Sequence, residues 1–124
     1  MKSKIFSFDN LRKRIENYQK NNKKVVMCHG MFGVLHIGHI RYLKQAEQYG
    51  DVVVVVITPD RYIDSVEKEN YESMRAEALA HLDWIDSVAV NNCAGFQEMI
   101  KVLSPDVFAK GFESVHVSES LNNQ

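Results

Sequence analysis

The sequence has few of the residues that mark several common classes of protein. It contains two cysteines and two prolines in 124 residues, and none of its apolar runs is long enough to cross a membrane. Cys28 and Cys93 are far apart, which suggests neither a disulfide framework nor a CxxC metal site. The N-terminal stretch MKSKIFSFDNLRKR lacks the apolar core of a signal peptide. We therefore expect a cytoplasmic protein that does not bind membranes.

The sequence also lacks a strong charge of either sign. Fifteen basic and sixteen acidic side chains nearly cancel, so the broad positive field that nucleic-acid binding requires is absent. We expect no nucleic-acid partner. Hydrophobic residues make up 45% of the chain, which together with its length predicts one folded domain with a substantial core.

The apolar pattern alternates between strand-like and helix-like segments. The run VVVVVI at 52–57 is β-branched or apolar throughout, which indicates a central parallel strand buried on both faces. Helices are predicted at 9–19, 38–50, 74–82 and 96–103, and strands at 25–28, 52–57, 87–90 and 107–109. The first of these helices is predicted to be capped by Ser7 or Asp9, and the second is predicted to stop at Gly50. This order predicts an α/β protein with an open parallel sheet flanked by helices.

The remaining segments carry little periodic signal. Residues 58–73 are polar and are predicted to contain a mobile loop, and residues 115–124 are predicted to be a loose tail. We expect an N-terminal helical extension at 1–22, a main domain at 23–114 and the tail beyond it.

The stretch HGMFGVLHIGH, from His29 to His39, connects the first predicted strand to the helix that follows. In open α/β sheets ligands bind beyond the carboxyl ends of the strands, where helix N-termini attract anions. Gly30 and Gly33 allow a tight turn or a close approach to a phosphate, and Gly38 leaves room at the helix start. The stretch is therefore a candidate phosphate-binding loop.

His36 and His39 are spaced so that both rings can lie on one side of the helix start and donate hydrogen bonds to one phosphate group. Such donors suit transfer at an α-phosphate, where charge builds as pyrophosphate leaves. Mg²⁺ is expected on the triphosphate. The pair by itself could also be incidental or half of a metal site, but no third ligand stands at a suitable spacing, so we predict no metal-ligating residues. His29, His81 and His116 are interpreted as structural or surface residues.

In this context residues 30–60, GMFGVLHIGHIRYLKQAEQYGDVVVVVITPD, resemble the HxGH nucleotidyltransferase superfamily. That superfamily includes glycerol-3-phosphate cytidylyltransferase, pantetheine-phosphate adenylyltransferase and, most similar here, the heptose-phosphate adenylyltransferase domain of ADP-heptose synthesis. The similarity continues through MRAEALAHLDWIDSVAV and SPDVFAKGFES, and so covers residues 24–114. HIGH also occurs in class I aminoacyl-tRNA synthetases, but those enzymes are far longer and carry a KMSKS loop that this chain lacks.

The resemblance implies a Rossmann-like fold, often homodimeric, that joins a nucleoside monophosphate from ATP or CTP to a phosphorylated sugar or alcohol and releases pyrophosphate. It also implies roles for individual residues: His36, His39 and Arg75 would contact phosphates and catalyse transfer. Nucleotide-binding positions would be Gly30, Met31, Phe32, Gly33, Gly38, Lys110 and Gly111, of which the last two match the family's KG beside base and ribose.

The sequence departs from the family pattern in three places. Phe32-Gly33 replaces the usual Phe-Asp, the stretch YIDSVEKENYESM is acidic where relatives carry positive charge, and no ISSTxIR-like segment follows residue 114. Two hypotheses therefore stay open. One is an active nucleotidyltransferase that acts on a sugar phosphate of the heptose-1-phosphate type. The other is a catalytically impaired nucleotide-binding or regulatory module, or a piece of a longer bifunctional enzyme.

Overall fold

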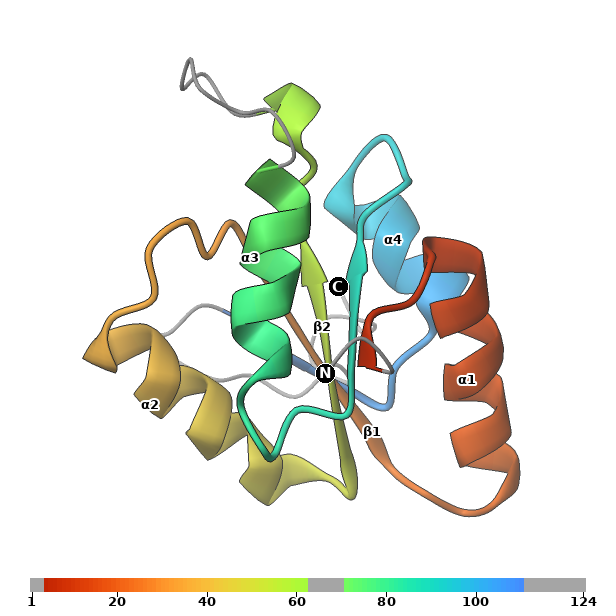
Figure 1. Ribbon diagram of the computed structural model, residues 1–124. Helices are drawn as coiled ribbons and strands as arrows, with labels where there is room; N and C mark the ends of the chain where they lie inside the picture. The colour runs from red at the N-terminus through yellow and green to blue at the C-terminus, as the bar shows by residue number, and fades with distance from the viewer. Residues whose placement is uncertain (1–3, 63–70, 111–124) are drawn as a thin grey trace.

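The computed structural model describes residues 4–62 and 71–110, which form a parallel sheet between two layers of helices (Figure 1). The strands are β1 (Val25–Gly30), β2 (Val52–Ile57), β3 (Ser87–Val90) and β4 (Val107–Ala109). The helices are α1 (Phe8–Lys20), α2 (Ile37–Ala46), α3 (Tyr71–Ala80) and α4 (Phe96–Leu103), with 3-10 turns η2 (Glu47–Tyr49) and η3 (Asp60–Tyr62). The prediction of an open parallel α/β sheet is confirmed.

The sheet has the order β3-β2-β1-β4, with all neighbours parallel. The chain runs outward from β1 to β2 and β3 and then returns to place β4 on the other side of β1. This reversal of strand order is the position at which open α/β sheets bind ligands, beyond the carboxyl end of the central strand. The end of β1 is therefore the expected position of a ligand-binding site.

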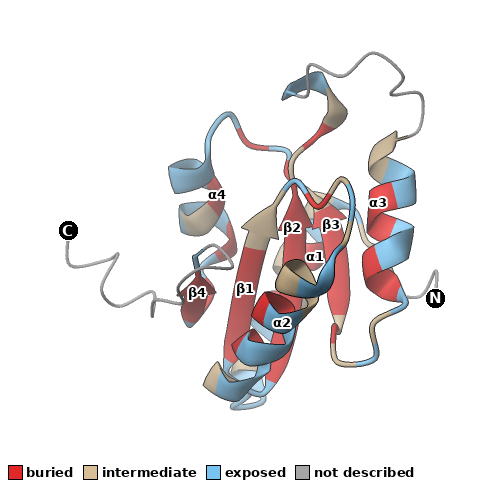
Figure 2. Cartoon of the chain, turned by 90° about the vertical axis from the view of Figure 1, so that its left-hand side faces the viewer, coloured by how far each residue is buried: buried red, intermediate tan, exposed pale blue. Residues whose placement is uncertain are grey.

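Alternate residues of each strand face two separate cores. Figure 2 shows the strands buried along most of their length, with α2 in front of them. On one face α2 and α3 cover residues such as Val53 and Val55, and on the other α1 and α4 cover Val52 and Val54. The inner face of α1 contributes Leu11, which is fully buried. Helix α1 therefore belongs to one of the two helical layers that cover the sheet. The predicted domain limits at 22 and 114 stay a prediction.

Most predicted boundaries agree with the structure, and the differences have local causes. Strand β1 continues two residues further, to Gly30, and α3 begins at Tyr71 where the sequence predicted a start near Met74. Ser7 caps α1, since its hydroxyl accepts a hydrogen bond from the Asn10 N–H at 3.1 Å. Half of the predicted loop at 58–73, residues 63–70, and all of the tail at 115–124 lie outside the described residues. In residues 4–62 and 71–110, no helix is long and apolar enough to cross a membrane.

The second helix was predicted to run to Gly50, but α2 ends at Ala46 and Gly50 follows the 3-10 turn η2, without a left-handed conformation. Its φ is −172°, which is extended backbone. A Cβ at this position would lie 2.8 Å from the Lys24 carbonyl oxygen and 2.6 Å from a Val26 methyl. The residue is therefore restricted by the close approach of the chain that enters β2 to the start of β1.

Candidate active site

His36 and His39 together cap the N-terminus of α2. The Nδ1 atom of His36 accepts a hydrogen bond from the Gly38 N–H at 3.0 Å, and Nδ1 of His39 accepts one from the His36 N–H at 3.3 Å. When Nδ1 accepts, the proton of a neutral imidazole is on Nε2. The ring centroids lie 4.0 Å apart. The cap therefore fixes both rings side by side in the tautomer that can donate from Nε2.

The surroundings of His39 favour its neutral form. Burial lowers the pKa of His39 below 6.5, and the neighbouring His36 lowers it further, while a hydrogen bond with the Val34 backbone acts in the opposite direction. Its ring meets the edge of Phe32 at a centroid distance of 5.7 Å. At neutral pH this ring is a neutral hydrogen-bond donor.

Phe32 anchors the loop that leads from β1 to α2. Its side chain is 5% exposed and stacks on Tyr42 of α2, with 6.4 Å between ring centroids. The backbone of Phe32 is left-handed, with φ of 51°, which costs a non-glycine residue roughly 1–2 kcal/mol. Burial of an aromatic ring offsets a cost of that size. A Cβ on Gly30 would lie 2.9 Å from this ring, so the glycine makes room for the anchor.

A cavity of about 420 Å³ opens beside the loop between β1 and α2, and we call it the first cavity. Its lining comes from the segment 29–34, from His39 and Tyr42 of α2, and from Tyr71 of α3. Binding sites for small molecules commonly begin at roughly 300 Å³. Among the described residues that line it there is no Asp, Glu, Lys or Arg. The polar groups that these residues contribute are therefore imidazoles, phenols and the backbone of the loop.

A second cavity of about 250 Å³ lies next to the first. Thr58 follows β2, Asn91 follows β3, and Gly95 precedes α4, so three chain segments meet around it. Gly95 provides no side-chain cap for α4, which leaves backbone N–H groups at the helix start.

His29, near the end of β1, lines both cavities. Its Nε2 atom is buried and has no hydrogen-bond partner in the part of the chain that the structure describes. Burial lowers the pKa of its imidazole below 6.5. From the sequence, His29 was interpreted as a structural or surface residue. Its position between the two cavities was not predicted, because no local pattern distinguishes it.

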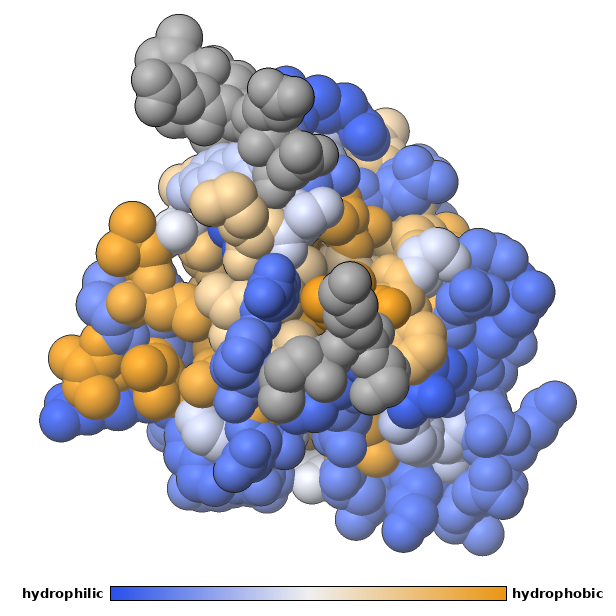
Figure 3. All heavy atoms as spheres, viewed as in Figure 1, coloured by the Kyte–Doolittle hydropathy of each residue, from blue (hydrophilic) through white to orange (hydrophobic). Residues whose placement is uncertain are grey.

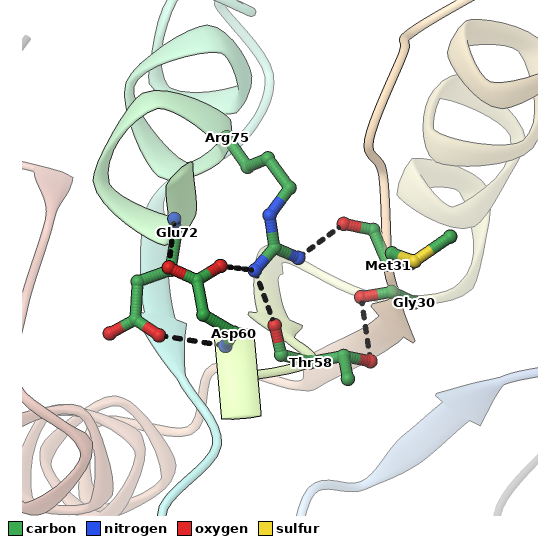
Figure 4. A network of polar contacts seen from close by, with 6 residues as sticks. All are labelled: Gly30, Met31, Thr58, Asp60, Glu72 and Arg75. Carbon is green, nitrogen blue, oxygen red and sulfur yellow. Dashed lines mark hydrogen bonds and ion pairs between the residues drawn. The ribbon is translucent and has the colours of Figure 1, made fainter. Parts of the chain in front are cut away.

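Arg75 of α3 joins the segments that follow β1 and β2 (Figure 4). Its guanidinium donates to the carbonyl oxygens of Met31 and Thr58, both at 2.7 Å, and to a carboxylate oxygen of Asp60 at 3.0 Å. The side chain is 1% exposed and lines neither cavity. Its contact with a phosphate stays a prediction, whereas the structure shows that it fixes the loop next to the first cavity.

Asp60 and Glu72 explain the early start of α3. The Asp60 N–H donates to the Glu72 carboxylate at 2.9 Å, and the Glu72 N–H donates to the Asp60 carboxylate at 3.1 Å (Figure 4). This reciprocal pair satisfies an N–H at the helix start, as a capping box does. Asp60 thus connects the first turn of α3 to Arg75.

The structure brings most of the predicted site together. The first cavity is lined by Gly30, Met31, Phe32, Gly33 and His39, with His36 in ring contact with His39 and Gly38 in the cap. Lys110 is exposed after β4, and Gly111 lies outside the described residues. Sequence reasoning missed His29, Tyr42 and Tyr71.

Comparison with known proteins identifies the family of this chain. The cytidylyltransferase-like family model matches residues 27–120, and the chain belongs to that family of nucleotidyltransferases. Among individual proteins, it is 36% identical over 113 residues to the bifunctional protein HldE of Geobacter metallireducens and 33% identical over 113 residues to that of Aliarcobacter butzleri. These alignments cover 88% of the chain but 23% and 24% of the relatives, so the chain spans about a quarter of their length.

A solved structure shows the same fold. The crystal structure of the lipopolysaccharide core biosynthesis protein from Thermoplasma volcanium superposes with a TM-score of 0.65 at 26% identity, covering 82% of this chain and 84% of that one. The family resemblance and the Rossmann-like fold inferred from the sequence are thereby confirmed.

Proposed function

We propose that this chain is a nucleotidyltransferase that transfers a nucleoside monophosphate from ATP or CTP to a sugar phosphate of the heptose-1-phosphate type and releases pyrophosphate. The observation that carries the proposal is the histidine pair at the start of α2, with rings 4.0 Å apart and His39 lining a 420 Å³ cavity. The family and the curated relatives support it.

The two cavities suit two substrates. The nucleotide occupies the first cavity, with its α-phosphate at the N-terminus of α2 beside the imidazoles of His36 and His39. The acceptor occupies the second cavity, where the start of α4 favours its phosphate. An acceptor phosphate oxygen forms a bond to the α-phosphorus while the bond from that phosphorus to the bridging oxygen breaks, and the electron pair leaves with pyrophosphate. No intermediate on the protein is required.

Mg²⁺ enters this scheme with the nucleotide. Its preferred ligands are carboxylate, carbonyl and water oxygens. In residues 4–62 and 71–110, no carboxylate lines the first cavity and no group of three or more His, Cys, Asp or Glu could hold a metal. We therefore propose that the ion is bound by the triphosphate and not by a protein site.

Pyrophosphate release tests the proposal. ATP and CTP are each incubated with a panel of sugar 1-phosphates, and wild-type protein is expected to release pyrophosphate with at least one pair. His36→Asn retains a good helix cap, so it should fold normally and yet lose about 100-fold in turnover or more. His81→Ala, at an exposed position after α3, is the matched control. An absence of turnover with every pair would refute an active enzyme.

The second candidate is a nucleotide-binding or regulatory module without turnover. It is favoured by Gly33, which leaves the loop without the carboxylate that the family pattern has there. Thermal unfolding with ATP, CTP and their diphosphates separates the two candidates, because a module raises its melting temperature with nucleotide but releases no pyrophosphate.

We also propose a homodimer. Three apolar side chains between β1 and α2 are strongly exposed: Met31 (51%), Val34 (77%) and Ile37 (60%). Figure 3 shows hydrophobic surface over the loop between β1 and α2 and over the start of α2. Apolar side chains that cluster on a surface are typical of protein interfaces. Sedimentation velocity should give the mass of a dimer, and Val34→Lys should shift it toward the monomer.

A further inference from the structure

Gly33 and Tyr71 are far apart in the sequence but share one space. A Cβ built on Gly33 would lie 2.5 Å from the Tyr71 hydroxyl oxygen and 3.7 Å from the ring carbon that carries it. The backbone of Gly33 is not left-handed, so its conformation does not require glycine. The hydroxyl of Tyr71 therefore occupies the place that a side chain at position 33 would take.

Tyr71 is held in this place by its neighbours. It is the first residue of α3, and the guanidinium carbon of Arg75, one turn later, lies 4.8 Å from the centre of its ring. Arg75 is in turn fixed to the Met31 carbonyl, which belongs to the same loop as Gly33. The phenol and the loop are thus positioned by one buried side chain.

Tyr71 also differs from the other tyrosine of the first cavity. The hydroxyl of Tyr42 already donates to the Ala109 carbonyl. The hydroxyl of Tyr71 has no hydrogen-bond partner among the described residues, although its side chain lines the cavity together with His39. Since the described residues of that lining include no Lys or Arg, a phenolic O–H is one of the few groups among them that can donate to an anion.

We propose that Tyr71 contacts the nucleotide directly and that its hydroxyl donates a hydrogen bond to a phosphate oxygen, a role that rests on the proposed function. Gly33 is the residue that makes this contact possible, because any larger side chain displaces the phenol. The Gly33 departure from the family pattern is then one half of a pair whose other half is Tyr71.

The proposed contact of Tyr71 with a phosphate is tested by measuring the binding of ATP and CTP, each with Mg²⁺, by calorimetry. Tyr71→Phe is expected to weaken binding about ten- to hundredfold, the range for a hydrogen bond to a charged group, with an unchanged melting temperature. Tyr49→Phe, which removes the hydroxyl of a tyrosine that lines neither cavity, should bind as wild type does.

A double-mutant cycle tests the pairing. Gly33→Ala should weaken binding as much as Tyr71→Phe does, yet have no further effect when combined with Tyr71→Ala. Additive losses, or wild-type affinity in Tyr71→Phe, would overturn the inference while leaving the proposed function intact. Failure of the wild-type protein to bind either nucleotide would overturn both.

Discussion

Arg75 offers the most direct test of how this site is built. We predict that Arg75→Ala destabilises the whole domain and does not merely weaken phosphate binding. Its three hydrogen bonds join the segments after β1 and β2 to α3, and the substitution leaves the Met31 and Thr58 carbonyls and the Asp60 carboxylate without their donor.

The magnitude follows from burial. Removing one partner of a buried ion pair costs about 3–5 kcal/mol. The Asp60 side chain is 21% exposed, so water can partly hydrate the carboxylate that remains, which places the loss near the lower end, at about 3 kcal/mol. A domain of this size is stable by roughly 5–15 kcal/mol. The melting temperature should therefore fall by about 10 °C.

Urea and thermal unfolding of Arg75→Ala measure this loss. Arg75→Lys should fall between the variant and wild type, because an ammonium keeps the charge but cannot reach all three acceptors in the geometry of the guanidinium fork. Arg41→Ala, at an exposed position of α2, is the matched control and should change stability by less than about 0.5 kcal/mol. An Arg75→Ala protein that is as stable as the control but no longer binds ATP or CTP would refute the structural role and favour a direct phosphate contact.

Three further predictions concern stability and reactivity. Burial lowers the pKa values of His29 and His39 below 6.5, so the unfolded chain binds protons that the folded chain does not; the free energy of unfolding should fall as pH drops below about 6.5, and His29→Gln should flatten that dependence in urea titrations. Burial raises the pKa of the Cys28 thiol to about 12, so a thiol reagent at pH 8 should modify it only after denaturation, and rapid modification of the native protein would contradict this environment. Leu11→Ala should cost about 2–5 kcal/mol because the side chain is fully buried, whereas Lys13→Ala on the exposed face of α1 should be nearly neutral; equal effects would show that α1 is not part of the core.

The elements with the strongest local patterns were predicted most accurately. Strand β3, helix α4 and strand β4 have the predicted limits, because each has a clear apolar period and turn residues at its borders. The start of α3 was predicted three residues late. Tyr71 and Glu72 show no apolar period, and what fixes that first turn is the Asp60 carboxylate, which belongs to another segment.

The histidine pair shows what the sequence by itself determined. A spacing of three residues at the start of a helix is a local relation, so placing His36 and His39 on one side of the helix required only the strand, loop and helix pattern around them. The same holds for the buried strand at 52–57 and for the sheet class. Each of these features leaves a pattern of residue types over a short stretch of the chain, so it can be recognised from the local sequence alone.

Only the tertiary structure decided what surrounds that pair. The close approach of Tyr71 to Gly33, the burial of Arg75 between two loops and the position of His29 between two cavities all join segments that are distant in the sequence. Such contacts depend on the order of strands in the sheet and on which helices begin at the same edge, and no local period encodes either. The sequence located the candidate phosphate-binding loop, and the tertiary packing around the end of β1 determined which side chains from elsewhere in the chain lie beside it.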